Sequence, residues 1–336
     1  MKNRKKALFP RISRLLLAPV ALFFLLACSS LQGGEEANPG EERLLTPRDQ
    51  LFGVAAVDPD HVWVVGDFGI ILHSNSAGSE WVLQDSGTLK PLLDVDFADP
   101  YHGWVVGEDG LVLQTSDQGT HWKRQESGTE SRLLSVDFLS PKEGVAVGAY
   151  GTILRTGDGG LTWQDDSLGE DLVLNKVSFV SRTHGWIVGE FGTILKTTDG
   201  GIRWFRQESG IEKTSLFGVG FVDEERGWCA GQDGVVLATR DGGTTWRPWK
   251  EDFRKSLFDV AVTERGGYIV GADGLVLEGI GEREDWKVSD RVISFSWLRG
   301  ISLIGGTGWM VGDRGTVLHT ADGGASWRFV EVKQGH

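Results

Sequence analysis

One stretch of the 336-residue chain decides the fold: residues 185–204, which read GWIVGEFGTILKTTDGGIRW. Its centre, Val-Gly-x-x-Gly, occurs seven times at spacings of 40 to 42 residues, once with Ala in place of Val. The first glycines of the seven copies are Gly66, Gly107, Gly148, Gly189, Gly231, Gly271 and Gly312. A tryptophan follows each of them at one offset: Trp81, Trp122, Trp163, Trp204, Trp246, Trp286 and Trp327. Two features that repeat in one register indicate a repeat architecture.

Each repeat contains four short apolar runs. In the second repeat these are residues 92–97, 103–107, 111–115 and 122–125, separated by turn residues such as Asp99-Pro100. Alternating runs bounded by Gly, Pro and Asp predict strands and hairpins. Four strands in about 41 residues make one propeller blade. The sequence therefore predicts an all-β protein, a single seven-bladed β-propeller with four antiparallel strands per blade over residues 51–336.

Tryptophan is unusually frequent, with 14 Trp against 3 Tyr. A second aromatic column precedes the glycines, with Val145 replacing the ring in the third repeat. The column consists of Trp63, Trp104, Trp186, Trp228, Tyr268 and Trp309. Rings at equivalent positions of every repeat predict packing between neighbouring blades rather than a sugar-stacking site. Only Trp249 and Trp297 lie outside the two columns.

Five repeats carry a Thr-x-Asp-x-Gly hairpin that resembles the Asp-box of bacterial neuraminidase-type repeats. The aspartates are Asp117, Asp158, Asp199, Asp241 and Asp322. Repeat one has Ser76 instead, and repeat six, residues 279–286, has lost both the Asp and the Gly. An Asp side chain accepts backbone N–H groups within such a turn, and Gly supplies positive φ. Because these aspartates lie on different blades, we expect turn structure and no catalysis.

The first 27 residues have a basic segment followed by the apolar run Leu15–Leu26. This arrangement is typical of a secretory signal. The segment ends Leu25-Leu26-Ala27-Cys28, which resembles the lipobox cut by bacterial lipoprotein signal peptidase. The resemblance implies that residues 1–27 are removed, that Cys28 is lipidated, and that residues 28–50 form a tether. We therefore expect an exported protein held on a membrane facing the periplasm or at the cell surface, and Ser29 leaves an outer-membrane destination open.

Charge excludes several partners. The formal net charge is −13, and removal of residues 1–27 leaves 28 basic against 47 acidic residues, a mature charge of −19. Such a surface repels nucleic acid.

We expect no cofactor and no metal site, because His61, His102 and His184 occupy one repeat position on separate blades. Cys229 replaces Val or Ile in its repeat, so we interpret it as a buried hydrophobe.

The whole repeat resembles the photosystem II stability and assembly factor family. The likeness rests on Ser127-Gly128-Thr129, on Leu133–Phe138 and on Gly185–Trp204, and covers about residues 51–332. It implies a non-catalytic, protein-binding propeller that assists assembly of a membrane protein complex. The partner expected from it is a subunit of such a complex, or else a component of an envelope transporter that the chain serves as an accessory lipoprotein.

Asp-boxes also occur in sialidases and other glycosidases, so a glycan-binding or sialidase-like protein is the enzymatic alternative. A sialidase needs an arginine cluster and a Tyr–Glu nucleophile pair. Only Tyr101, Tyr150 and Tyr268 are present, and Tyr268 belongs to the packing column. No carboxylate pair stands out from the repeat pattern, as a glycosidase would require. We therefore expect no catalytic residues.

The positions free to vary lie within the Gly-x-x-Gly frame, at the hairpin tips around the central channel. They form a ring rich in acids, with three aromatic residues. Aromatic residues are frequent binding hot spots, and acids select cationic partners. The predicted binding residues are Asp67, Phe68, Glu108, Asp109, Tyr150, Glu190, Phe191, Asp233, Asp273, Asp313 and Arg314.

Overall fold

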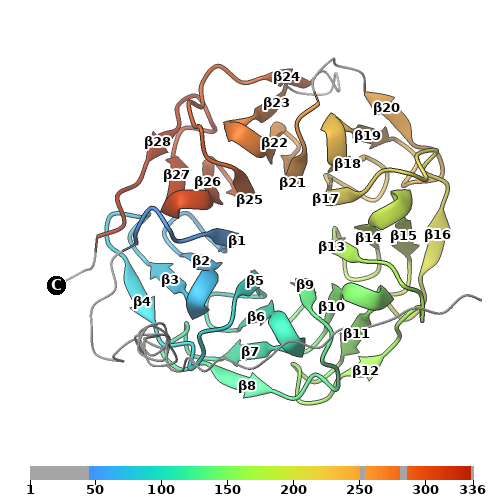
Figure 1. Cartoon of the computed structure of the whole chain (residues 1–336), viewed down its shortest axis with the longest axis horizontal. Coiled ribbons are helices and arrows are strands. Elements are labelled where there is room, and N and C mark those ends of the chain that lie inside the picture. Colours follow the sequence, from blue (N-terminus) through green and yellow to red (C-terminus); the bar gives the residue numbers. More distant parts are fainter. Residues whose placement is uncertain (1–44, 250–253, 281–285, 334–336) are drawn as a thin grey trace, which may run out of the picture. The chain divides into compact units, whose positions relative to one another are not determined.

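A computed structural model describes residues 45–249, 254–280 and 286–333, which form a ring of seven four-stranded antiparallel sheets (Figure 1). Each sheet contains four strands that follow one another in the chain. The predicted seven-bladed, all-β propeller is confirmed. The predicted signal peptide, Cys28 and most of the tether lie outside the described residues. Within the described part, no helix is long and apolar enough to span a membrane.

In every blade the first strand is innermost and the fourth strand is outermost (Figure 1). The strands are β1 (Leu51–Ala56), β2 (Val62–Gly66), β3 (Ile71–Ser74) and β4 (Val82–Gln84); β5 (Leu92–Phe97), β6 (Gly103–Gly107), β7 (Val112–Thr115) and β8 (Lys123–Gln125); β9 (Leu133–Phe138), β10 (Gly144–Gly148), β11 (Ile153–Thr156) and β12 (Gln164–Asp165); β13 (Leu174–Phe179), β14 (Gly185–Gly189), β15 (Ile194–Thr197) and β16 (Phe205–Gln207); β17 (Leu216–Phe221), β18 (Gly227–Gly231), β19 (Val236–Thr239) and β20 (Arg247–Trp249); β21 (Leu257–Thr263), β22 (Gly266–Gly271), β23 (Val276–Ile280) and β24 (Trp286–Val288); β25 (Leu298–Ile304), β26 (Thr307–Gly312), β27 (Thr316–Thr320) and β28 (Arg328–Phe329).

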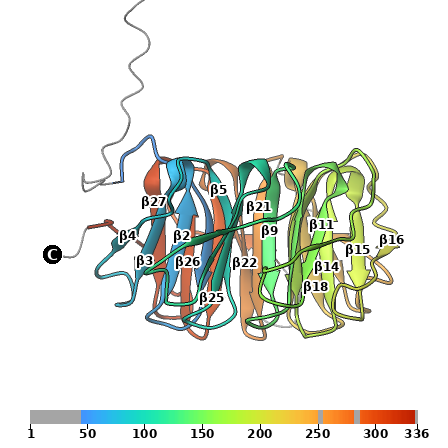
Figure 2. The ribbon, with the colours of Figure 1, turned by 90° about the horizontal axis from the view of Figure 1, so that it is seen from below.

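A three-residue 3-10 turn joins the second and third strands of every blade. These turns are η1 (Asp67–Gly69), η2 (Glu108–Gly110), η3 (Ala149–Gly151), η4 (Glu190–Gly192), η5 (Gln232–Gly234), η6 (Ala272–Gly274) and η8 (Asp313–Gly315). The innermost strands β1, β5, β9, β13, β17, β21 and β25 contact one another in sequence around the centre. In the side view the strands run between the two faces of the ring (Figure 2).

Apolar packing between blades forms the core. The Trp104 ring stacks on Phe138 of the next blade, with centroids 3.5 Å apart, and Phe138 meets Trp163 edge-on at 6.0 Å. The same arrangement occurs between Trp186 and Phe221, at 3.4 Å. The prediction that the two aromatic columns pack neighbouring blades together is confirmed.

Side chains cap the innermost edge of the sheets, where backbone N–H groups lack a neighbouring strand. The Val136 N–H donates to Asp94 Oδ2 of the preceding blade at 3.2 Å, and the Phe138 N–H donates to Asp96 Oδ2 at 2.7 Å. Asp137 accepts the N–H of Phe179 at 2.8 Å. Because unpaired buried N–H groups are costly, these acids join the blades as well as line the channel.

Blades one and seven close the ring without exchanging a strand. The Trp81 N–H donates to the Lys333 carbonyl at 3.2 Å, and the Ala56 N–H donates to Ser302 Oγ at 3.1 Å. The first strand begins at Leu51, but the chain already lies against blade seven from Leu45. There the Gly315 N–H donates to the Asp49 carbonyl at 2.8 Å.

Candidate binding face

Seven turns and the six linkers between blades share one face of the ring, which we call the tip face. It comprises η1–η6, η8 and the segments that join each outermost strand to the next innermost strand. A Cβ on Gly69 would lie 1.9 Å from the Thr88 carbonyl, and one on Gly110 would lie 1.9 Å from that of Thr129. In these two blades the second glycine of the frame is therefore required, because a linker crosses the turn there and lies directly beside it.

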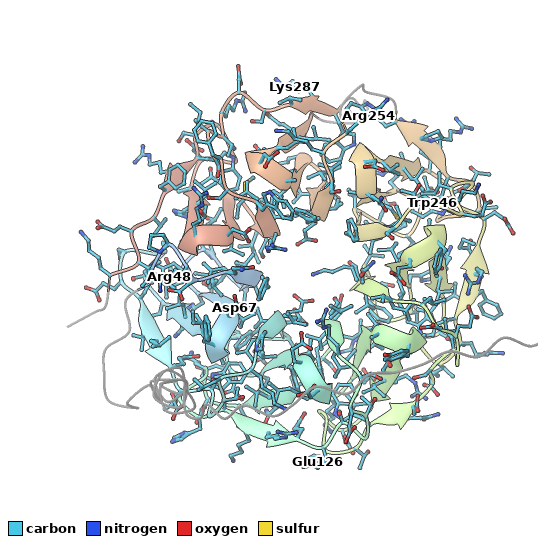
Figure 3. The ribbon with its side chains drawn as sticks, viewed as in Figure 1. Arg48, Asp67, Glu126, Trp246, Arg254 and Lys287 are labelled. Carbon is cyan, nitrogen blue, oxygen red and sulfur yellow. The ribbon has the colours of Figure 1, made fainter. Side chains whose placement is uncertain are left out.

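The middle residue of every turn adopts a left-handed conformation that L side chains disfavour. These residues are Phe68, Asp109, Tyr150, Phe191, Asp233, Asp273 and Arg314, with φ between 53° and 62°. The conformation points the side chain away from the sheet, and Phe68, Tyr150 and Phe191 are 52%, 67% and 60% exposed. The structure thus places the predicted tip residues on one face, with Asp67 toward the inner part of the ring in Figure 3.

Basic side chains pair with four of the predicted acids. Glu108 contacts Arg132 at 2.7 Å, and Asp109 contacts Lys90 at 3.0 Å. Asp273 and Asp313 pair with Lys255 and Arg299 at 3.4 and 2.5 Å. Exposed pairs of this kind add little stability. They do reduce the net negative charge that a partner would meet on the tip face.

A second set of residues, not predicted from the sequence, forms the rim of the central channel on the tip face. A β-bulge follows the first residue of each innermost strand, and the bulged residue faces the channel. These seven residues, which we call the mouth ring, are Phe52, Leu93, Leu134, Asn175, Phe217, Phe258 and Arg299. A bulge re-aims the side chain of its extra residue. The sequence contains one signal for the mouth ring: the residue after the first Leu of each innermost strand is apolar in five of the seven repeats.

Aromatic rings gather on one side of the mouth ring. Phe258 lies between Phe217 and Trp297, with centroids 5.9 and 5.5 Å away. The Arg299 guanidinium lies 5.5 Å from the Phe52 centroid, 5.8 Å from that of Phe258 and 5.4 Å from that of Trp297. Cation–π attraction orders these rings around Arg299. Trp297, which belongs to neither tryptophan column, is thus part of the tip face.

Below the mouth ring, the channel holds charged groups from several blades. Lys176 Nζ lies 3.2 Å from Asp94 Oδ2. Burial alone would lower the pKa of Lys176, but the carboxylates of Asp259 and Asp94 raise it overall. Burial, followed by the neighbouring Asp96 charge, raises the pKa of Asp137 to about 8. The same surroundings favour the protonated form of the Asp137 carboxyl.

In the outer hairpins the Asp-box aspartates make hydrogen bonds within their own turns. Asp117 Oδ1 accepts the His121 N–H at 2.9 Å and the Thr115 hydroxyl at 2.9 Å, while Gly119 has φ of 79°. The Thr115 hydroxyl in turn accepts the Gly119 N–H at 2.9 Å. The aspartates Asp158, Asp199, Asp241 and Asp322 make the same contact with the backbone N–H four residues on.

Two of the three histidines singled out from the sequence pair with neighbouring aspartates, and the cysteine Cys229 lies in the core. His61 and His102 pair with Asp58 and Asp99, each at 2.9 Å. Cys229 is buried, and burial raises the pKa of its thiol. Within the residues that the structure describes, no three His, Cys, Asp or Glu side chains are grouped to hold a metal ion.

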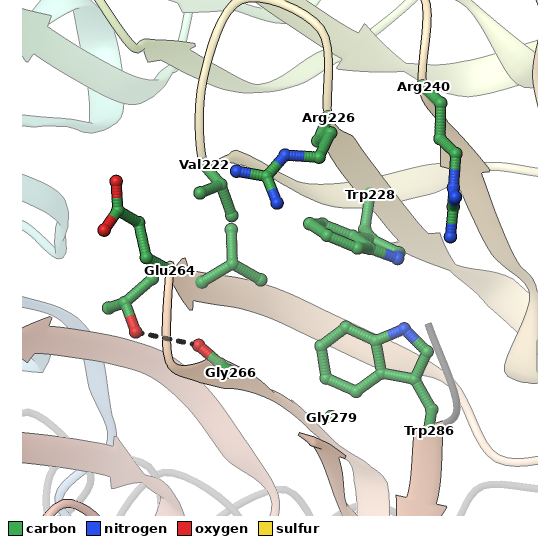
Figure 4. Close-up of a pocket in the computed structure, with 11 residues that line it drawn as sticks. Val222, Arg226, Trp228, Arg240, Glu264, Gly266, Gly279 and Trp286 are labelled. Atoms are coloured by element: carbon green, nitrogen blue, oxygen red, sulfur yellow. Dashed lines mark hydrogen bonds between the residues drawn. The ribbon is translucent and has the colours of Figure 1, made fainter. Parts of the chain in front are cut away.

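A cavity of about 180 Å³ lies between blades five and six, beside the connection between β21 and β22 (Figure 4). Trp228 and Trp286 meet edge-on inside it, with centroids 6.0 Å apart. At other interfaces the Asp-box turn of the next blade fills this place, as where Trp186 Nε1 donates to the Gly242 carbonyl at 3.3 Å. The sequence of blade six lacks the Asp and the Gly of the Asp-box, and its residues 281–285 lie outside the described part of the chain.

These features define a class of protein: a repeat propeller whose recurring pattern is used for packing and whose tip-face residues differ from blade to blade. The chain belongs to the family of the Photosynthesis system II assembly factor YCF48. The family model matches residues 79–165, 121–206, 167–252 and 246–335, which together span 79–335. The resemblance inferred from the sequence is confirmed. No curated protein matched the chain.

Solved structures share the fold at low identity. "YCF48 bound to D1 peptide" has a TM-score of 0.69 at 20% identity, covering 84% of this chain and 96% of that one. YCF48 from Cyanidioschyzon merolae has a TM-score of 0.69 at 19% identity, covering 82% and 97%. Virginiamycin B lyase from Staphylococcus aureus has a TM-score of 0.70 at 11% identity, covering 82% and 97%. The fold thus occurs in both assembly factors and enzymes.

Proposed function

We propose that this protein is a lipid-anchored, non-catalytic propeller that holds a subunit of a membrane protein complex during assembly. The family membership carries the proposal, since one structure of a family protein is described as bound to D1 peptide. The geometry supports it as well. The tryptophan columns and Asp-boxes pack blades and turns, whereas the tip face carries residues that differ from blade to blade.

A binding role also agrees with the chemistry of the described side chains. The acids of the outer hairpins are held by their own turns, and those of the channel cap strand edges. Tyr268, the tyrosine of the packing column, is buried and donates to the Gly324 carbonyl at 3.2 Å. These groups are engaged in packing, so their chemistry supports a scaffold.

The experiment is affinity purification of the full, lipidated chain from membranes of its own organism. We expect integral subunits of one complex to be recovered in an incompletely assembled form. An envelope transporter in their place would assign the chain to the accessory role. Recovery of no membrane protein beyond a tag-only control, or hydrolysis of a glycoside abolished by one carboxylate substitution, would overturn the proposal.

A further inference from the structure

An apolar track crosses the tip face on the side of blades five, six, seven and one. It starts at the aromatic half of the mouth ring, Phe217, Phe258 and Phe52, and continues through Trp297. From Trp297 the track continues outward along the linker before β25. This linker passes over the turn of blade six, where the Ser294 carbonyl lies against Gly274. Ile293, Phe295 and Trp297 on this linker are 72%, 85% and 42% exposed. Three exposed apolar side chains on one short linker are a feature of interaction sites.

The charges beside the track are already matched. Asp273 pairs with Lys255 and accepts the Trp297 indole N–H at 3.2 Å, and Asp313 pairs with Arg299. A cationic partner would therefore gain little on this side of the ring. The mature charge of −19 repels an acidic one. The track fits a segment with apolar side chains and little charge.

The shape of the track selects the form of the partner. The hollow at the channel mouth measures about 90 Å³, whereas sites for drug-sized ligands occupy roughly 300–1,000 Å³. A single side chain fits this volume, but a compact ligand does not. Because Asp94, Lys176 and Asp259 also line the hollow, the side chain that enters it is a polar one, and the apolar contacts lie outside it. An extended segment that places one side chain in the mouth and lays others along Trp297 and Phe295 uses the whole track.

The point of chain entry indicates where that segment comes from. Residues 45–50 lie on the tip face, because Asp49 and Gln50 carbonyls accept N–H groups of Gly315 and Asp67 at the tips of blades seven and one. In Figure 2 this stretch precedes β1 at the same face. Cys28, the proposed lipid site, is 17 residues before Leu45. That length spans at most about 60 Å, so the tip face can turn toward the bilayer without the chain passing around the ring.

We propose that the apolar track binds an extended, apolar segment of an integral membrane protein at the point where that segment leaves the bilayer. This inference rests on the proposed function and names the part of the tip face that performs it. The track differs from the ring of tip acids predicted from the sequence, which lies largely beside it.

Photo-crosslinking in native membranes tests the position. The full chain is made with benzoylphenylalanine at Phe295, or at Phe205 as control, since Phe205 is an exposed residue of the outermost strand β16. We expect a protein adduct from position 295 at the border of a membrane span, and none from position 205. Adducts only from position 205 place the partner on the outer rim and overturn the track. Lipid adducts alone from position 295 show that the track rests on the bilayer and also overturn it.

A synthetic peptide of the crosslinked segment then tests the chemistry. Phe295→Ala and Trp297→Ala should each weaken its binding about 10-fold or more, whereas Glu108→Gln with Asp109→Asn should change it less than about 2-fold. The opposite order would assign binding to the tip acids and overturn the track while leaving the proposed function intact. Failure of the wild-type chain to recover any membrane protein is the separate result that removes the proposed function itself.

Discussion

Asp137 illustrates how a single carboxyl can link blades and respond to pH. Its Oδ2 accepts the Phe179 N–H at 2.8 Å, while burial and Asp96 raise its pKa from 3.8 to about 8. The folded protein therefore keeps a proton between about pH 4 and 8 that the unfolded chain has lost. By linkage, this group favours folding at low pH, and its contribution is lost as pH rises through 8.

We predict that Asp137→Asn becomes progressively more stable than the wild type as pH increases from 5 to 8, with the difference levelling above about 8. The Asn side chain can still accept the Phe179 N–H, but it does not titrate. Thermal unfolding at a series of pH values measures the difference. Glu212→Gln, at an exposed position of the linker before β17, is the control and should show no such trend. A constant difference for Asp137→Asn would contradict the assignment.

The two cysteines give a second residue-scale prediction. Cys28 is the proposed lipid site, whereas Cys229 is buried between blades. Palmitate label should enter the wild type and Cys229→Ala equally, and should be absent from Cys28→Ala, as measured by autoradiography of the purified chain. Equal labelling of Cys28→Ala would show that the lipobox resemblance misleads.

Among the elements, the turns depend on glycine for two separate reasons. Gly110 and Gly128 both have positive φ, 64° and 80°, but only Gly110 faces a carbonyl, since a Cβ on Gly128 would meet nothing within 4 Å. Alanine at a left-handed position costs roughly 1–2 kcal/mol. We expect Gly128→Ala to lose about that much free energy of unfolding and Gly110→Ala clearly more, in chemical denaturation. Equal losses would mean that the linker can move aside without cost.

The tryptophans of the second strands act between elements, because each packs the sheet of one blade against the sheet of the next. Trp186 is fully buried and stacks on Phe221 of the next blade. Trp186→Ala should lower the free energy of unfolding by about 3–5 kcal/mol, measured by urea denaturation. Trp297→Ala, at an exposed site, is the matched control and should cost far less. A small effect at Trp186 would show that the blade interface repacks around the missing ring.

The whole molecule depends on the closure between blades one and seven, to which the last described residues contribute. Val330 and Val332 pack against the core of blades seven and one, and Lys333 accepts the Trp81 N–H. Deletion of residues 330–336 should therefore destabilise the propeller by about 1–3 kcal/mol, seen as a lower melting temperature. Deletion of residues 334–336 alone is the control and should leave the melting temperature unchanged. Equal behaviour of both deletions would show that side-chain packing alone closes the ring.

By itself the sequence determined the blades, because each is four consecutive strands whose apolar alternation and turn residues are local. It also determined the role of the aromatic columns and the Asp-boxes, whose spacing repeats in register. The tertiary structure alone decided what the seven repeats form together. Phe52, Phe258 and Arg299 lie far apart in the chain and meet only because bulges turn one residue per blade into the channel. Likewise, Asp313 pairs with Arg299 because the start of β25 lies beside the turn η8 of the same blade. No local sequence pattern predicts that approach.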